Sequence, residues 1–141
     1  MPNSTLLRSA IATYCQWAES ISRERELFAH ADDLSYGQHY AVLYADNGLI
    51  GMNNSMHELF RSAVLAALSA NGYSLSEDTY IFDRASGHRP ATGEAYLLAE
   101  VEVGTVSVTV DINHDGTLRG ATCDEMESVW YADIATAIAN R

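Results

Sequence analysis

The stretch Ala95–Cys123 constrains the fold most, because its pairing as three antiparallel strands can be worked out from the sequence alone. Apolar and polar side chains alternate on both sides of Gly104-Thr105, a pair that suits a type II′ hairpin turn. With this turn, Val103 lies opposite Val106, and one face of both strands is apolar throughout. We therefore expect a half-buried antiparallel sheet.

The second turn of this meander fixes the register of its third strand. A loop of two or four residues would place Arg119 on the apolar face. The three-residue loop His114-Asp115-Gly116, with its glycine left-handed as a bulge, instead pairs Ile112 with Leu118. The same register sets Arg119 opposite Asp111 as a cross-strand pair of opposite charge. We therefore predict the three-residue loop.

Three segments have the apolar spacing of amphipathic helices, which would cover the apolar face of this sheet. The first begins after Ser4, a good N-cap residue. The second opens with the capping box Ser55-Met56-His57-Glu58 and is closed by Gly72. The third would be capped by Asp124. The predicted helices span about residues 4–29, 55–71 and 124–140.

Two further stretches complete the predicted fold. Asp78–Asp83 alternates like a strand. In Leu34–Met52 the alternating aromatic and β-branched residues favour a hairpin, whereas a short helix closed by Gly48 is the alternative. We predict a single α+β domain over residues 1–141, in which an antiparallel sheet of about four to six strands ends in the meander and has one face covered by the three helices.

The net negative charge of the chain limits the classes of partner that it can bind. There are 19 acidic residues against 8 basic ones, all of them Arg, for a net charge of −11. Whether the absence of Lys reflects codon usage or function stays open. Direct nucleic-acid binding is disfavoured, because phosphate contacts need a basic patch. Complementary charge instead favours a protein partner with a basic surface. The predicted partner-binding residues are Glu100, Glu102, Asp111, Asp124, Glu125 and Glu127.

One segment is locally basic. Arg84–Glu94, called the basic loop below, is rich in Gly, Pro and small polar residues and carries Arg84, His88 and Arg89. Long exposed connections often carry function. We consider it a solvated hairpin loop or, alternatively, a second contact for a carboxylate, a phosphate or an acidic partner.

The sequence contains no convincing motif for metal binding or catalysis. Asp111 to Gly116 resembles the first half of an EF-hand loop, but Thr122 stands where a bidentate Glu is needed, so we interpret it as a turn. The histidines have no metal-ligand spacing, and no nucleophile elbow, P-loop or dinucleotide fingerprint occurs. Cys15 is expected to be a packed thiol. We therefore expect no metal, no cofactor and no catalytic role.

The sequence thus predicts a non-enzymatic acidic binding or inhibitor protein that blocks a basic nucleic-acid-binding or toxin surface. An anti-CRISPR, anti-restriction or immunity protein would act in this way. One alternative is a small acidic secretion-type chaperone that forms a homodimer. Another is a small-ligand binder or enzyme that uses Arg84, His88 and Arg89. We expect a cytoplasmic protein without membrane contact, because the N-terminus lacks signal-peptide features and no apolar run reaches membrane-spanning length.

Overall fold

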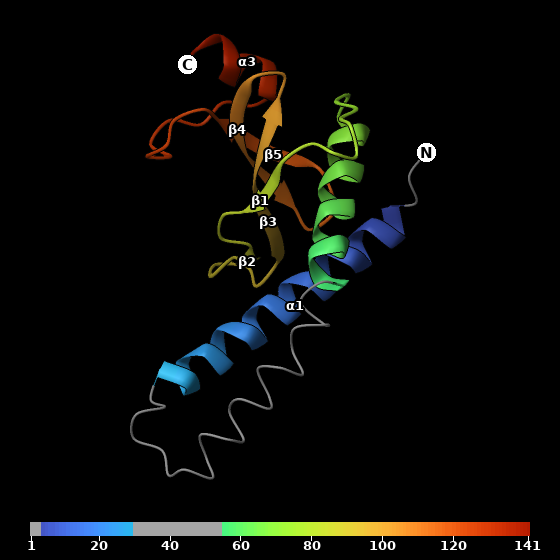
Figure 1. Ribbon diagram of the computed structural model, residues 1–141, viewed down its shortest axis with the longest axis vertical. Coiled ribbons are helices and arrows are strands. Elements are labelled where there is room, and N and C mark those ends of the chain that lie inside the picture. The colour runs from blue at the N-terminus through green and yellow to red at the C-terminus, as the bar shows by residue number, and fades with distance from the viewer. Residues whose placement is uncertain (1–3, 30–54) are drawn as a thin grey trace.

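The computed structural model describes residues 4–29 and 55–141, with side chains described for residues 5–20 and 55–141. A twisted antiparallel sheet has helices on one side and an irregular loop on the other (Figure 1). This arrangement confirms the predicted α+β class with an antiparallel sheet. The alternatives for Leu34–Met52 lie outside the described residues.

The sheet follows the order β1-β3-β4-β5, and β2 pairs with another part of β3. The strands are β1 Ile81–Asp83, β2 Gly87–His88, β3 Ala95–Val103, β4 Val106–Asn113 and β5 Leu118–Thr122. The predicted register of the first hairpin is confirmed, with Val103 opposite Val106 and a positive φ of 65° at Gly104. The fully buried residues of β3 and β4 consequently share one face, which is turned to the helices: Leu97, Ala99, Val101, Val108, Val110 and Ile112.

The second turn also has the predicted form, but the predicted pair of Asp111 and Arg119 is wrong. Ile112 lies opposite Leu118, and the glycine of the loop has a φ of 86°. Asp111 then lies opposite Gly120, because Arg119 is the extra residue of a β-bulge. Leu118 and Ala121 both face the core, opposite Ile112 and Val110. Only one residue separates Ile112 from Val110, whereas two separate Leu118 from Ala121, so one residue of β5 must be left unpaired.

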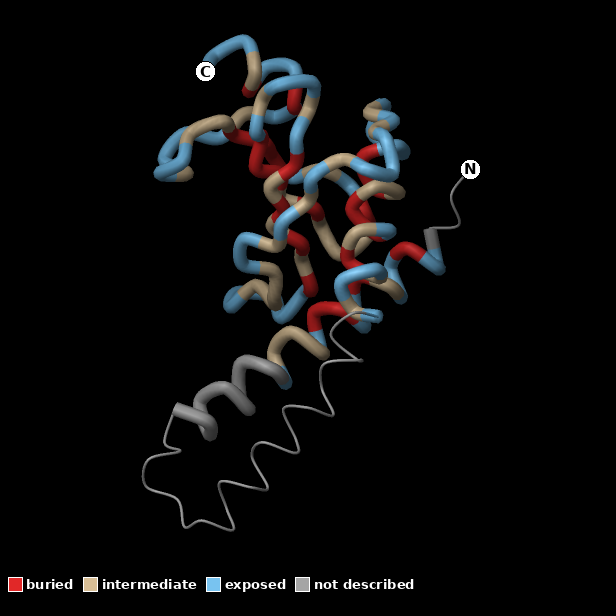
Figure 2. Tube along the Cα trace, in the orientation of Figure 1, coloured by how far each residue is buried: buried red, intermediate tan, exposed pale blue. Residues whose placement is uncertain are grey.

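Two long helices cover most of the apolar face of the sheet, and the C-terminal helix adds Ile134 and Ala137 to the same core. Helix α1, Ser4–Ala29, matches its predicted bounds. The second helix covers residues 55–70 and ends in a Schellman motif, in which Gly72 has a φ of 91° and the Tyr73 N–H donates to the Leu68 carbonyl at 2.8 Å. Buried residues concentrate between these helices and the sheet (Figure 2). They include Leu7, Ile11, Tyr14, Cys15, Phe60, Val64, Leu68, Leu97, Val101, Val108, Val110 and Ile112.

The C-terminal helix is much shorter than predicted. Helix α3 covers only Ile134–Ala139, and its N-cap is Asp133, whose carboxylate accepts the Thr136 N–H at 2.7 Å. Residues 124–133 are therefore not helical, contrary to the prediction that Asp124 caps a helix. The run from Val129 to Tyr131 is β-branched and aromatic, which disfavours helix. In addition, Tyr131 forms an antiparallel bridge with Ala121 of β5.

Residues 124–130, called the cover loop below, lie instead on the side of the sheet opposite the helices (Figure 1). We call this side the open face. Asp124 organises the loop by accepting the N–H groups of Met126 and Ser128 at 3.0 and 3.1 Å. Trp130 lies against Gly120 of β5, where a Cβ atom would come within 3.4 Å of its ring. The open face is thus partly covered by the chain that was expected to form a helix.

The loop between β4 and β5 is expected to be sensitive to a methyl group at one glycine. Gly116 and Gly93 both have positive φ, but an added Cβ at Gly116 would collide with the side chain of Leu7, whereas one at Gly93 would meet nothing within 4 Å. We expect Gly116→Ala to lower the free energy of unfolding by about 2–4 kcal/mol and Gly93→Ala by about 1 kcal/mol. Urea unfolding followed by circular dichroism measures both. Equal losses would contradict the packing of this loop against α1.

Candidate functional site

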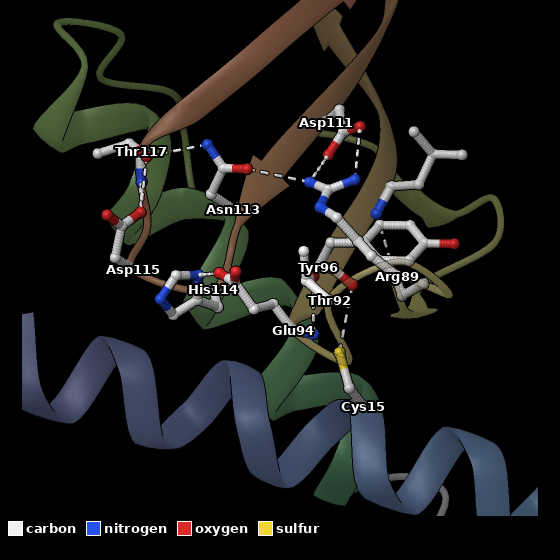
Figure 3. A network of polar contacts seen from close by, with 12 residues as sticks. Cys15, Arg89, Thr92, Glu94, Tyr96, Asp111, Asn113, His114, Asp115 and Thr117 are labelled. Atoms are coloured by element: carbon white, nitrogen blue, oxygen red, sulfur yellow. Dashed lines mark hydrogen bonds and ion pairs between the residues drawn. The ribbon is translucent and has the colours of Figure 1, made fainter.

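The centre of the open face is a clamp around Arg89. Its two terminal nitrogens donate to the two oxygens of Asp111 at 2.7 and 3.3 Å, and one of them also donates to Asn113 Oδ1 at 3.0 Å. The guanidinium lies 4.6 Å from the centroid of the Tyr96 ring (Figure 3). The Arg89 and Asp111 side chains are only 17% and 16% exposed. A bidentate pair of this kind fixes the orientation of both side chains.

The sheet supplies this geometry through its period of two. Tyr96 lies opposite Asn113, and Asp111 stands two residues before Asn113 in β4, so the three side chains share the open face. Burial raises the pKa of Tyr96, the Asp111 carboxylate raises it further, and Arg89 opposes the shift. The Cys15 thiol of α1 donates to the Tyr96 carbonyl at 3.2 Å from the other side of the sheet. The clamp is therefore anchored directly on the core.

The other two basic residues of the basic loop also pair with carboxylates of the same chain. Arg84 lies 3.5 Å from Glu100 and 3.4 Å from Glu127, and about a third of its side chain is exposed. His88 Nδ1 lies 2.6 Å from Glu19 of α1. The two regions that the sequence singled out separately, the acidic residues and the basic loop, therefore lie against each other. This internal pairing had no signal in the sequence.

The remaining acidic candidates have different environments. Asp124 serves its own loop, where hydrogen bonds from Ser128 and Met126 lower the pKa of its carboxyl group. Glu102 and Glu125 are exposed. Within residues 5–20 and 55–141 neither of these two glutamates makes an ion pair. Within the described residues, they are the members of the predicted set whose carboxylates bind neither an arginine nor a group of their own loop, so these carboxylates are available to a partner.

Beside the clamp lies a hollow of about 690 Å³, called the open-face hollow below. Arg89 and the next three residues of the basic loop form one wall, and Trp130 of the cover loop lies on its rim. Arg119, the bulge residue, also lines it. The complete lining is Arg89, Pro90, Ala91, Thr92, Tyr96, Leu98, Asp111, Arg119, Gly120 and Trp130. Sequence reasoning missed this site, although the interrupted alternation of β5 at Arg119 was visible.

A second hollow of about 580 Å³ lies between α1, the 55–70 helix and β1. In it the Tyr14 hydroxyl donates to Asp83, whose other oxygen accepts the hydroxyl of Ser86 at 2.7 Å. Burial, followed by the hydrogen bond to Asp83, raises the pKa of Tyr14 strongly. In the described part of the chain, Trp17 Nε1 is buried here without a hydrogen-bond partner. Tyr14 and Asp83 are therefore hydrogen-bonded to each other in this hollow.

The described residues hold no group of three or more His, Cys, Asp or Glu side chains that could bind a metal ion. The residues of the EF-hand-like turn have other partners, since Asp111 binds Arg89 and Asp115 accepts the Thr117 hydroxyl at 2.6 Å. His114 pairs with Glu94 at 2.5 Å, as Figure 3 shows. The side chains of Asp111, Asp115 and His114 thus each bind another residue of the turn, the basic loop or the clamp.

Comparison with protein-family models, with curated proteins and with solved structures finds no significant match for this chain. Over the described residues, no helix combines the length and the apolar character needed to cross a membrane.

Removal of the central arginine is expected to be costly. Arg89→Ala leaves the carboxylate of Asp111 mostly buried without its cation, so we expect a loss of about 2–4 kcal/mol in the free energy of unfolding. Arg84→Ala is the matched control, because its longer and more exposed ion pairs should contribute about 1 kcal/mol or less. Chemical denaturation measures both losses. A loss from Arg89→Ala no larger than that of the control would show that the clamp does not hold the basic loop.

The two cysteines are expected to differ in reactivity. Burial raises the pKa of the Cys15 thiol to about 12, so the fraction of reactive thiolate at pH 8 is negligible. Burial raises the pKa of the Cys123 thiol as well, but this side chain is only partly buried and the reagent can reach it, whereas Cys15 is fully buried. Iodoacetamide at pH 8 should therefore modify Cys123 in the folded protein and reach Cys15 only after denaturation, as peptide mass spectrometry would detect. Comparable labelling of Cys15 in the native state would reopen its role as a nucleophile.

Proposed function

We propose that the protein is a non-enzymatic binding protein whose open face docks onto a basic surface of a protein partner. The observation that carries this proposal is a set of large apolar side chains exposed on this side of the molecule. Tyr80, Phe82, Trp130 and Met126 are 51%, 50%, 39% and 84% exposed, respectively. Exposed apolar residues next to charged ones are typical of protein interfaces.

The strand pairing supports the placement of the first two residues. Phe82 lies opposite Glu100, and the Tyr80 carbonyl accepts the Glu102 N–H at 3.2 Å, so both aromatic side chains share a face with these glutamates. An aromatic surface rimmed by carboxylates fits a partner with apolar groups surrounded by arginine or lysine.

The cover loop supplies the other two residues in a fixed conformation. Its Trp130 indole N–H donates to the Glu127 carbonyl at 2.9 Å, and the Glu127 side chain reaches Arg84 beside β1. Glu127 also has a φ of 53°, a left-handed conformation that is unfavourable for a residue with a side chain. A loop already ordered in this way loses less entropy when a partner binds.

The ion pairs within the chain reduce the number of predicted acidic residues that are available to a partner. Arg89 neutralises Asp111, whereas Glu100 and Glu127 share the single Arg84, so these three carboxylates and two arginines leave one net negative charge on the surface. Glu102 and Glu125 keep their charges, in a protein of net charge −11. Long-range attraction by the whole chain would steer a basic partner, and these two residues would meet it at close range. Inhibition of a nucleic-acid-binding or toxin surface, as by an anti-CRISPR, anti-restriction or immunity protein, is the function of this kind that we favour.

The test uses two variants of the open face and one control. Glu102→Arg reverses an unpaired charge and Phe82→Ser removes apolar area, while Glu77→Arg makes the same charge change at an exposed residue between the 55–70 helix and β1. Proteins captured from a host lysate by the wild type are purified and their affinity is measured at two salt concentrations. We expect the open-face variants to weaken binding by about tenfold or more, the control to leave it unchanged, and duplex DNA to compete.

Equal binding by all three variants, or no competition by DNA, would overturn the proposal. The homodimeric chaperone remains the alternative that the same apolar residues favour. Sedimentation velocity distinguishes it, because a dimer that Phe82→Ser converts to monomer would assign the open face to a second copy of this chain.

A further inference from the structure

We propose that the open-face hollow is a binding site for a small anionic molecule, which has a carboxylate or phosphate group held by Arg119 and a flat apolar body packed on Trp130. The hollow shares Trp130 with the surface proposed above to contact a protein, but its lining includes neither Tyr80 nor Phe82. Its volume of about 690 Å³ falls within the range of small-molecule sites.

The charge of the hollow is the first argument. Its charged lining residues are Arg89, Asp111 and Arg119. Arg89 and Asp111 neutralise each other through two hydrogen bonds, and Arg89 also binds Asn113. For Arg119, no carboxylate of the described residues lies within ion-pair distance. The lining therefore carries one net positive charge in a strongly acidic protein, which favours an anion.

The position of Arg119 is the second argument. A bulge turns a side chain away from the direction it would have in a regular strand, and bulges occur often beside binding sites. Here the bulge keeps Leu118 and Ala121 on the core side while it adds Arg119 to the wall of the hollow. The side chain is exposed, so a guanidinium with five donors remains open to a ligand.

Trp130 is the third argument. The ring is 39% exposed and rests on Gly120, where any side chain would approach the Tyr131 carbonyl within 3.2 Å. Its N–H is already bonded to Glu127, so the ring offers a ligand its apolar surface and no hydrogen bond. Leu98, Pro90 and Ala91 extend the apolar lining. A flat ring on the ligand fits this surface, because aromatic rings stack on one another.

The three basic residues considered from the sequence have a different role. Arg84, His88 and Arg89 are all paired with carboxylates of the same chain, so they do not supply the free positive charge of the site. Of the basic loop, only Arg89 and the three residues after it line the hollow.

The experiment follows the indole N–H signals of the full chain by ¹⁵N-labelled NMR. The chain has two tryptophans, so two signals are expected, and Trp130→Phe assigns them. Indole-3-acetate and adenosine monophosphate are titrated as a carboxylate and a phosphate with a ring. Their neutral counterparts indole-3-acetamide and adenosine, together with inorganic phosphate, complete the set. We expect the Trp130 signal to shift with at least one ringed anion, and the carboxylate and phosphate arms identify which group is preferred.

Two arginine variants make the assignment specific. Arg119→Gln should weaken binding of that anion by about tenfold to a hundredfold, as loss of a charged hydrogen-bonding group does. Arg61→Gln, on the other side of the sheet, should leave it unchanged. A silent Trp130 signal, equal binding of the neutral counterparts, or equal binding by Arg119→Gln would overturn the proposal. Binding of inorganic phosphate as tight as that of the ringed anions would overturn the part assigned to Trp130.

Discussion

The ion pair between Arg89 and Asp111 organises the open face. It ties the basic loop to β4 across the width of β3, in addition to the two-residue strand β2 and the hydrogen bonds that join Arg84 and Ser86 to Leu98. A mostly buried pair is stable only when its remaining hydrogen-bonding capacity is satisfied. Asn113 and the ring of Tyr96 provide this here. One wall of the open-face hollow exists because this pair keeps the basic loop folded back on the sheet.

The fold was largely predictable where local chemistry and periodicity agree. The register of β3 and β4 follows from alternation and from one glycine turn, and the 55–70 helix follows from its capping residues. The C-terminal segment failed because Met126, Val129 and Trp130 also fit a helical period. The strand-like bridge of Tyr131 with Ala121 and the capping of Ile134–Ala139 by Asp133 prevailed over that pattern. These contacts depend on where β5 ends, which local periodicity does not contain.

The site was less predictable than the fold. The sequence identified the acidic residues and the basic loop as the unusual segments, and both lie on the open face. It gave no indication that they would pair, because the partners are 22 residues apart for Arg89 and Asp111 and 43 apart for Arg84 and Glu127. From the sequence, Arg119 was assigned to a cross-strand pair, and Trp130 fell within the predicted C-terminal helix. The bulge and the cover loop give them a different role.

The bulge in β5 also bears on how this protein can diversify. A residue inside a regular ladder is constrained by its cross-strand neighbour, and a shift in its register would turn the whole strand inside out. Arg119 has no such neighbour, since Asp111 and Ile112 already oppose Gly120 and Leu118. Its identity can therefore change without disturbing the buried residues on either side. In the site proposed here, a substitution at this one position would alter the charge offered to a ligand and leave the core as it is.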